Sequence, residues 1–486
     1  MSVREVTERK ELANFIGNTW LASKGDEVLC RDPAAEDRVV GAVPDSTDED
    51  VDAAVAAAAA AAAEWAARPA PERGDLLSRW RELIAENADE LALLMTREMG
   101  KPLSESYAEL GRARGELDYT AGEGTRILGD TIPSRVAGQL VYTLREPLGV
   151  VAAITPWNFP AVAPIRKIAP ALVAGNTVVL KPALETPLTA LALATLLRDA
   201  GVPEGVLNVV CGRGSSVGSR LIADRRVNGV SFTGSTGVGR TVAETVARRL
   251  GKVQLELGGK NAAYVHSAAD LRRAVDHIAT AAIQATGQRC TAVSRVLVQD
   301  EIADDVVELL SGLYSSYRVG PGVDPDTQVG PLINKAQFER VSGYIETGLE
   351  EGAVRTTARR SLPDGLYVEP TVLDRVTRDM VVAREEIFGP VISVLRVSDV
   401  DEAISIANDC DYGLASVVFS ERLDVAMRYT QGVQAGMVHV NHGTISQPHV
   451  PFGGVKDSGS GAFSIGSTNQ DFFTNTKTVY LSPTVI

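Results

Sequence analysis

Residues 227–239 read VNGVSFTGSTGVG, and this stretch decides the fold class. Its first half, VNGVSF, is a short apolar run, and the glycine-rich half opens a helix-length segment at 237–250. Backbone amides in such a strand-to-helix turn can hold a pyrophosphate. The glycines fall as GxxGxG, which is not the usual dinucleotide order, so the spacing alone leaves a phosphate site and a tight turn equally favoured.

The same alternation extends from this stretch in both directions. Further short apolar runs occur at 149–155 (GVVAAIT), 177–180 (TVVL), 206–210 (VLNVV) and 253–257 (VQLEL). Helix-length segments lie between them at 162–174, 187–200 and 215–223. Five strands joined by crossover helices predict a parallel, doubly wound sheet, which binds ligands at the carboxyl ends of its strands.

Other elements are expected on both sides of this sheet. Residues 46–100 contain a capping pattern, eight successive alanines and apolar residues at helical spacing. This pattern predicts two or more helices that serve as scaffold. After Gly258 we expect helices at 271–285 and 302–317, and strands at 293–298, 367–372, 391–397, 415–419 and 436–440. The predicted fold class is therefore α/β, with two doubly wound parallel domains facing each other across a cleft.

Composition excludes several classes of function. The formal net charge is −14 and the pI is about 5.0, so no nucleic-acid partner is expected. The N-terminus is charged where a signal peptide is apolar, and no run of 18 apolar residues occurs, so we expect a cytoplasmic protein with no membrane partner. The four cysteines form no CxxC pair and the five histidines no HExxH pattern, so no metal site is expected.

Three residues near predicted element ends are candidates for chemistry. Asn158, in PWNFP, is either a buried turn residue or an amide donor aimed at a developing negative charge. Cys290, in GQRCT, is a lone cysteine of the kind that is most often inert, but the adjacent Arg289 and the loop position favour a thiolate. Glu256, in LELGGK, is either a buried ion-pair member or a general base whose pKa is raised by burial.

Seven segments occur together in the order and at the spacing of one family: PWNFP, LKPA, FTGSTGVG, LELGGKN, GQRC, EEIFGPV and PFGGVKDSG. The chain resembles the aldehyde dehydrogenase superfamily over essentially its whole length. The resemblance implies an NAD(P)-binding domain at 1–123 and 148–257, a catalytic domain at 258–450, and a small β oligomerisation excursion at 124–147 and 468–486. It also implies a homodimer or homotetramer that oxidises a small-molecule aldehyde with NAD or NADP.

The resemblance assigns a role to each candidate. Cys290 would attack the aldehyde, Asn158 and the Cys290 backbone N–H would hold the oxyanion, and Glu256 would activate the water that hydrolyses the thioester. The residues expected at the cofactor are Trp157 and Ser235 at the pyrophosphate, Lys181 at the adenosine ribose, Glu386 at the nicotinamide ribose, and Leu184, Gly234, Gly239 and Phe388 in the same segments.

Two departures from the family pattern concern the cofactor and proton transfer. Leu184 stands where NAD-preferring members usually carry Glu, and Leu neither chelates the ribose 2′-hydroxyl nor repels a 2′-phosphate. NADP is therefore expected to be tolerated or preferred. The GRE segment near the C-terminus is replaced, with Ala462, Phe463 and Ser464 in that region, which puts a proton-relay Glu in doubt.

A third departure, Arg166 in PIRKIAP, bears on the substrate. This helix position is often Trp in enzymes for simple aliphatic aldehydes, whereas in succinic semialdehyde dehydrogenases an Arg there binds the distal carboxylate. The second Arg of those enzymes is absent, and Gln284 stands near its position. GQRCTA and the KPA segment look more like alpha-ketoglutaric semialdehyde dehydrogenases, so we expect an ω-oxo acid. A structural salt bridge is the other interpretation of Arg166.

Two alternative functions stay open on the sequence. One is an aromatic aldehyde dehydrogenase, for benzaldehyde-like or vanillin-like substrates, with Phe159 and Phe452 lining an aromatic tunnel. The other is a catalytically silent structural relative, against which the presence of Cys290, Glu256 and Asn158 argues.

Overall fold

The computed structural model describes residues 2–9 and 11–482, and their longer strands form two large sheets and one small one. The first sheet has the order β2-β1-β9-β8-β7-β10-β11-β21. Its centre is parallel and consists of β7 (Val150–Ile154), β8 (Thr177–Lys181), β9 (Leu207–Val209), β10 (Val227–Thr233) and β11 (Lys252–Glu256). The five predicted parallel strands are confirmed.

Antiparallel strands extend this sheet at both edges. β1 (Ala13–Ile16) and β2 (Thr19–Ala22) lie at one edge, and β21 (Gly459–Ser460) returns from the far end of the chain to pair with β11. A separate hairpin of β3 (Asp26–Asp32) and β4 (Ala35–Asp45) was not predicted, because its apolar residues are interrupted by charged ones and few of its side chains are buried.

Helices cover the first sheet and connect its strands. The crossover helices are α6 (Val162–Val173), α7 (Pro187–Asp199), α8 (Ser219–Ala223) and α9 (Thr236–Ala247). The N-terminal helices are α2 (Asp48–Ala67), α3 (Ala70–Glu86), α4 (Ala88–Met99) and α5 (Leu103–Glu123). The alanine run lies in α2, where the small side chains allow close packing: Thr177 in β8 donates a hydrogen bond to the Ala58 carbonyl at 2.9 Å.

The second sheet has the order β14-β15-β16-β13-β12-β18-β19 and is parallel except at β14. Its strands are β12 (Asn261–Val265), β13 (Val293–Gln299), β14 (Val354–Arg355), β15 (Thr371–Asp374), β16 (Val391–Val397), β18 (Ala415–Phe419) and β19 (Met437–Val440). The longer helices of this half are α10 (Leu271–Ile283), α11 (Ala303–Ser316), α12 (Lys335–Glu350), α14 (Val400–Asn408) and α15 (Leu423–Gly432). The strand expected at 367–372 begins only at Thr371.

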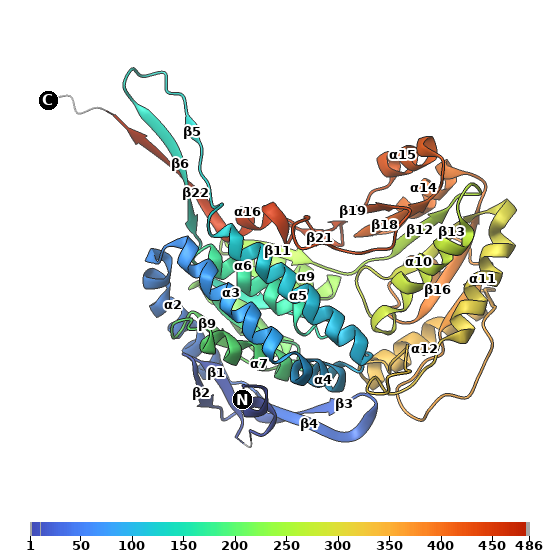
Figure 1. Ribbon diagram of the computed structural model, residues 1–486, viewed down its shortest axis with the longest axis horizontal. Helices are drawn as coiled ribbons and strands as arrows, with labels where there is room; N and C mark the ends of the chain where they lie inside the picture. Colours follow the sequence, from blue (N-terminus) through green and yellow to red (C-terminus); the bar gives the residue numbers. More distant parts are fainter. Residues whose placement is uncertain (1, 10, 483–486) are drawn as a thin grey trace.

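A small third sheet projects away from the other two (Figure 1). It is made of β22 (Thr474–Leu481), β6 (Leu140–Pro147) and β5 (Thr131–Ile132), which pair antiparallel in that order. Several of its large apolar side chains are exposed, among them Leu140, Leu144, Tyr480 and Leu481. Of the predicted segment 468–486, residues 483–486 lie outside the described residues.

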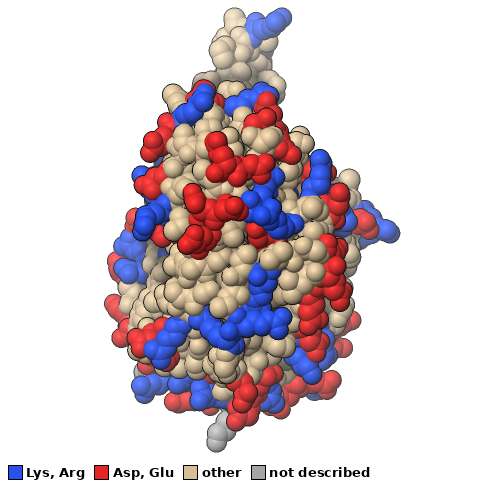
Figure 2. All heavy atoms as spheres, turned by 90° about the vertical axis from the view of Figure 1, so that its right-hand side faces the viewer, with Lys and Arg blue, Asp and Glu red and all other residues tan. Residues whose placement is uncertain are grey.

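No helix in the described ranges is long and apolar enough to cross a bilayer. On the face formed by the right-hand side of Figure 1, acidic and basic side chains are interspersed (Figure 2).

Candidate active site

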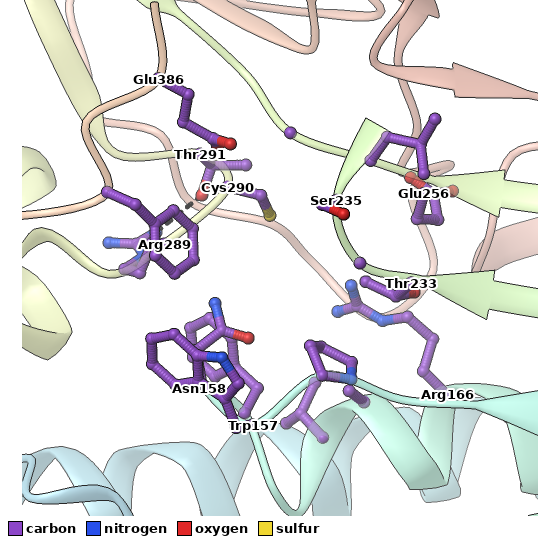
Figure 3. Close-up of a pocket in the computed structure, with 18 of the residues that line it drawn as sticks. Trp157, Asn158, Arg166, Thr233, Ser235, Glu256, Arg289, Cys290, Thr291 and Glu386 are labelled. Carbon is purple, nitrogen blue, oxygen red and sulfur yellow. Dashed lines mark hydrogen bonds between the residues drawn. The ribbon is translucent and has the colours of Figure 1, made fainter. Parts of the chain in front are cut away.

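A cavity lies between the two large sheets and is lined from both halves of the molecule. From the first half come the segments that follow β7, β10 and β11. From the second half come the loop before β13, the start of α12 and the loop before β16. Cys290, Asn158 and Glu256 all line this cavity, although they are far apart in the sequence (Figure 3).

An unusual backbone conformation places Cys290 in the cavity. α10 ends at Ile283 and not at 285 as predicted, because Ala285 and Thr286 adopt left-handed conformations with φ of 52° and 58°. Such conformations are strained for residues with a Cβ and need support from their surroundings. That support includes a hydrogen bond from the Thr286 hydroxyl to the Gly330 carbonyl at 3.1 Å. The Asn261 amide donates to the Cys290 carbonyl at 2.7 Å and fixes the far side of the loop.

The electrostatics at Cys290 favour the thiol. Burial, helped by the carboxylates of Glu386 and Glu256, raises the pKa of Cys290 to about 11. Arg289 and Arg166 lower the pKa, so the sequence-based expectation for Arg289 has the right sign, but burial outweighs it.

Asn158 joins the two halves of the site. Its side-chain amide donates to the Gln288 carbonyl at 2.8 Å, two residues before Cys290, which leaves its second N–H without a protein acceptor among the described residues. The backbone carbonyl of Asn158 accepts a hydrogen bond from the Lys101 ammonium at 2.9 Å, and Lys101 forms a buried ion pair with Glu109. Glu109 in turn accepts from the backbone N–H groups of Ala161 and Val162, at 2.8 and 2.9 Å, at the start of α6.

Glu256 is the last residue of β11 and is buried in the cavity wall. One carboxylate oxygen accepts from the Ser464 backbone N–H at 3.3 Å, and the other has no hydrogen-bond partner. Burial raises the pKa of Glu256 to about 7, while the nearby Lys167 and Arg166 lower it. Burial lowers the pKa of Lys167, whose ammonium donates to Ser231 at 2.9 Å. A buried carboxyl with a free oxygen and such a pKa is suited to general-base work.

The groups expected at the nicotinamide end of the cofactor surround the same cavity. Trp157, Gly234, Ser235, Glu386 and Phe388 all line it. Ser235 precedes α9 and makes no side-chain capping bond, so the N-terminal amides of this 12-residue helix stay available for an anion. Glu386 accepts from the Gly259 N–H at 3.0 Å, and a Cβ on Gly258 would lie 2.4 Å from its carboxylate. These residues fit a bound dinucleotide.

The remaining cofactor candidates do not line this cavity. Lys181 is buried at the end of β8, and its ammonium donates to the Pro182 carbonyl at 2.9 Å. Leu184 is half-buried and packs against the core of the first half. Gly239 lies in α9, where a Cβ would collide with Leu257 at 2.5 Å, so this glycine serves helix-to-strand packing.

Three of the four substrate candidates line the cavity: Phe159, Arg166 and Phe452. The Arg166 guanidinium lies over the Phe452 ring at 4.7 Å and forks onto Glu116 through two hydrogen bonds of 2.5 and 3.2 Å. Gln284 is not in the cavity wall; it accepts a hydrogen bond from Arg289.

Sequence reasoning missed several residues of the wall. Arg112 comes from α5, Gln337 and Arg340 from α12, and Ser446 from the loop after β19. None lies in a recognisable motif, and Arg112 belongs to a helix that reads as scaffold. Arg340 donates to the Glu386 carbonyl at 2.7 Å and thereby holds that segment. In the described ranges, no three His, Cys, Asp or Glu residues are grouped so that they could hold a metal ion.

Comparisons with known proteins identify the family of the chain. The model of the aldehyde dehydrogenase family matches residues 20–479. The chain is similar to alpha-ketoglutaric semialdehyde dehydrogenase of Bacillus subtilis, with 41% identity over 98% of this chain and 99% of the relative. It is also similar to succinate-semialdehyde dehydrogenase (NADP(+)) of Escherichia coli, with 41% identity over 92% and 93% of the two chains. The NAD+ complex of an aldehyde dehydrogenase from Bacillus cereus superposes with a TM-score of 0.95 at 37% identity, covering 99% of this chain and 98% of that one.

The matched region includes the loop that carries Cys290, the strand end that carries Glu256 and the turn that carries Asn158. Fold, cavity and relatives therefore agree on one conclusion: the chain belongs to the aldehyde dehydrogenase family and is an oxidoreductase that acts on aldehydes.

Proposed function

We propose that this chain oxidises a carboxylate-bearing semialdehyde to the dicarboxylic acid with NAD or NADP. The observation that carries the proposal is the cavity itself, which holds Cys290, Asn158 and Glu256 together with the cationic side chains of Arg112 and Arg166. Cations in a partly closed cleft attract an anionic substrate more strongly than an uncharged one. Both relatives named above act on semialdehydes, so the aromatic alternative is not favoured.

The chemistry assigned to the protein begins at Cys290. Its thiol loses its proton to solvent and the sulfur attacks the aldehyde carbon, while the free N–H of Asn158 and the Cys290 backbone N–H stabilise the oxyanion. Asn158 is already held by Gln288 at 2.8 Å, so little reorganisation is needed when the charge develops.

A bound nicotinamide supplies the hydride acceptor, and the carbon is then held as a thioester of Cys290. Glu256 removes a proton from water, the hydroxide adds to the thioester carbon, and the C–S bond breaks to give the acid and the free thiol. The unpartnered oxygen of Glu256 is the one available to the water. We assign the cofactor to the segments of Ser235, Glu386 and Phe388, with Lys181 at the adenosine ribose.

NADP use follows from Leu184. Replacing Leu184 by Glu would place a carboxylate near the 2′-phosphate, and the like-charge contact is worth on the order of several kcal/mol before screening. We expect L184E to lower kcat/KM for NADP at least tenfold more than for NAD, measured by the absorbance of the reduced cofactor. Equal losses with both cofactors would show that Leu184 does not face the ribose.

We further propose a homodimer or homotetramer that assembles through the third sheet. β22 is an edge strand of eight residues, and an exposed edge of this length with apolar neighbours is a template for pairing with another chain.

A substrate panel tests the proposed function. Succinic, glutaric and alpha-ketoglutaric semialdehydes are compared with pentanal and benzaldehyde, each with NAD and with NADP. We expect kcat/KM to be at least tenfold higher for a semialdehyde acid than for any uncharged aldehyde. A preference for benzaldehyde would replace the proposal by the aromatic alternative, and no activity on any aldehyde would favour a silent relative.

A further inference from the structure

Arg112 is a cation in the cavity without an anionic partner. It lies on α5, is half-buried, and lines the same cavity as Cys290. Its guanidinium stands over the Phe159 ring at 5.6 Å. Within residues 2–9 and 11–482, the structure gives this side chain no hydrogen bond and no ion pair. Burial and the neighbouring charge of Arg166 lower the pKa of Arg112, while the carboxylates of Glu109 and Glu116 raise it.

Of the other three arginines of the cavity wall, Arg340 donates to the Glu386 backbone carbonyl at 2.7 Å, and Arg166 and Arg289 are already occupied by protein partners. Arg166 forks onto the buried Glu116 through Nη2 and Nε, and these are the two donors with which a guanidinium grips a carboxylate. Arg289 donates to Gln284, to the Thr291 hydroxyl and to the Thr444 carbonyl. A substrate carboxylate would have to displace protein partners from either of them.

The charges of the cavity wall also indicate Arg112 as the residue that would meet a substrate carboxylate. Glu116 pairs with Arg166 and Glu109 pairs with Lys101, which leaves the positive charge of Arg112 without an ion-pair partner among the described residues. An incoming carboxylate would neutralise it. If Arg166 bound the substrate alone, the buried Glu116 would lie beside the substrate carboxylate and repel it.

We propose that Arg112 is the residue that binds the distal carboxylate of the substrate, with the Arg166–Glu116 pair as a neutral wall beside it. The guanidinium lies over the ring of Phe159, and the free N–H groups of the fork would donate to both oxygens of the carboxylate. This inference rests on the proposed function, because it requires an aldehyde with an anionic far end.

The experiment measures kcat and KM for glutaric semialdehyde and for pentanal, which has the same chain length without the carboxylate. The variants are R112M, R112K and R166M, with R114M as the matched control. Arg114 lies two residues further along α5, is exposed, and is not in the wall of the cavity. All variants are assayed at saturating cofactor.

We expect R112M to lower the ratio of kcat/KM for glutaric semialdehyde over pentanal by about 10- to 150-fold, as loss of a charge-assisted hydrogen bond predicts. The change should appear mainly in KM for the charged substrate. R112K keeps the charge but loses the fork, so its ratio should lie between those of R112M and the wild type. R114M should keep the wild-type ratio.

The outcomes separate this inference from the proposed function. If the wild type itself does not prefer glutaric semialdehyde, the proposed function fails. If the wild type shows the preference and R112M retains it while R166M loses it, Arg166 is the carboxylate ligand and the inference is overturned. If R112M does not fold, R112K decides in the same assay, and an unchanged ratio in R112K overturns the inference.

Discussion

At the scale of single residues, the reaction depends on two side chains that act at different steps. We expect C290A to abolish both steady turnover and any burst of reduced cofactor, because no covalent adduct can form. E256Q removes the base and should slow turnover by about 10²- to 10⁴-fold, the range for general-base catalysis. Because E256Q affects hydrolysis more than acylation, a thioester should accumulate on Cys290, and intact-protein mass spectrometry would detect it. Wild-type turnover by C290A would refute the mechanism.

The pH dependence of hydrolysis is set by Glu256 together with its buried neighbour Lys167. Glu256 must be ionised to act as a base, and burial raises its pKa to about 7. The hydrolytic rate should therefore fall about tenfold per pH unit below pH 7. The positive charge of Lys167 lowers the pKa of Glu256, so its removal should raise that pKa and move the acidic limb to higher pH.

The measurement is single-turnover hydrolysis of the thioester between pH 5 and 9 in wild type and K167M. R114M provides a control far from the carboxylate. An acidic limb that moves to lower pH in K167M, or does not move, would contradict this account of Glu256.

At the scale of elements, a buried ion pair connects α4, α5 and α6 to the site. Lys101 follows α4, Glu109 lies in α5, and Glu109 accepts from the first N–H groups of α6. E109Q leaves the Lys101 charge buried without its partner, which costs about 3 to 5 kcal/mol. We expect a clearly lower melting temperature, together with loss of activity because Lys101 also holds the Asn158 carbonyl.

D424N is the comparison for this prediction. It breaks the exposed Arg422–Asp424 pair, and exposed ion pairs contribute little to stability because water screens them. Equal melting temperatures for E109Q and D424N, measured by differential scanning calorimetry, would show that the buried pair does not support the fold.

Elements that the chain builds from local signals could be predicted from the sequence. The strands β7, β8 and β10 were found because they are short runs rich in apolar and β-branched residues, and the crossover helices because helix-length segments lie between these runs. The β3–β4 hairpin was missed because it has little buried apolar surface. The end of α10 was misplaced because the left-handed Ala285 and Thr286 are held by contacts from elsewhere, such as Gly330.

The same distinction applies to the site. The sequence alone indicates the importance of Cys290, Glu256 and Asn158, because each lies in a motif. Arg112 and the partnership of Arg166 with Glu116 depend on how α5 packs against α6, which no single segment encodes. The salt-bridge interpretation of Arg166 is thus present in the structure, while its role toward a substrate stays a prediction.

At the scale of the whole molecule, the projecting sheet is the feature that a single chain does not explain. A chain that ends after Thr474 lacks β22 and leaves β6 with only the two-residue β5 as a partner. We expect this truncation to convert the assembly to monomers, measured by size-exclusion chromatography with light scattering. Removal of residues 483–486 alone, outside the described part of the chain, should leave the assembly intact. A monomeric wild type would refute the proposed assembly.

Helix α5 contributes residues around the cavity, and this has a consequence for how the substrate range of the protein can change. α5 contributes Arg112 and Glu116 to the neighbourhood of the substrate, but no atom of this helix is assigned a chemical step. At this helix, the residues near the substrate are thus separate from the residues that carry out the reaction. A few substitutions within 21 codons could redirect the enzyme toward another aldehyde while the nucleophile, the base and the oxyanion donor keep their positions. Diversification of substrate range in laboratory libraries should accordingly begin at this helix.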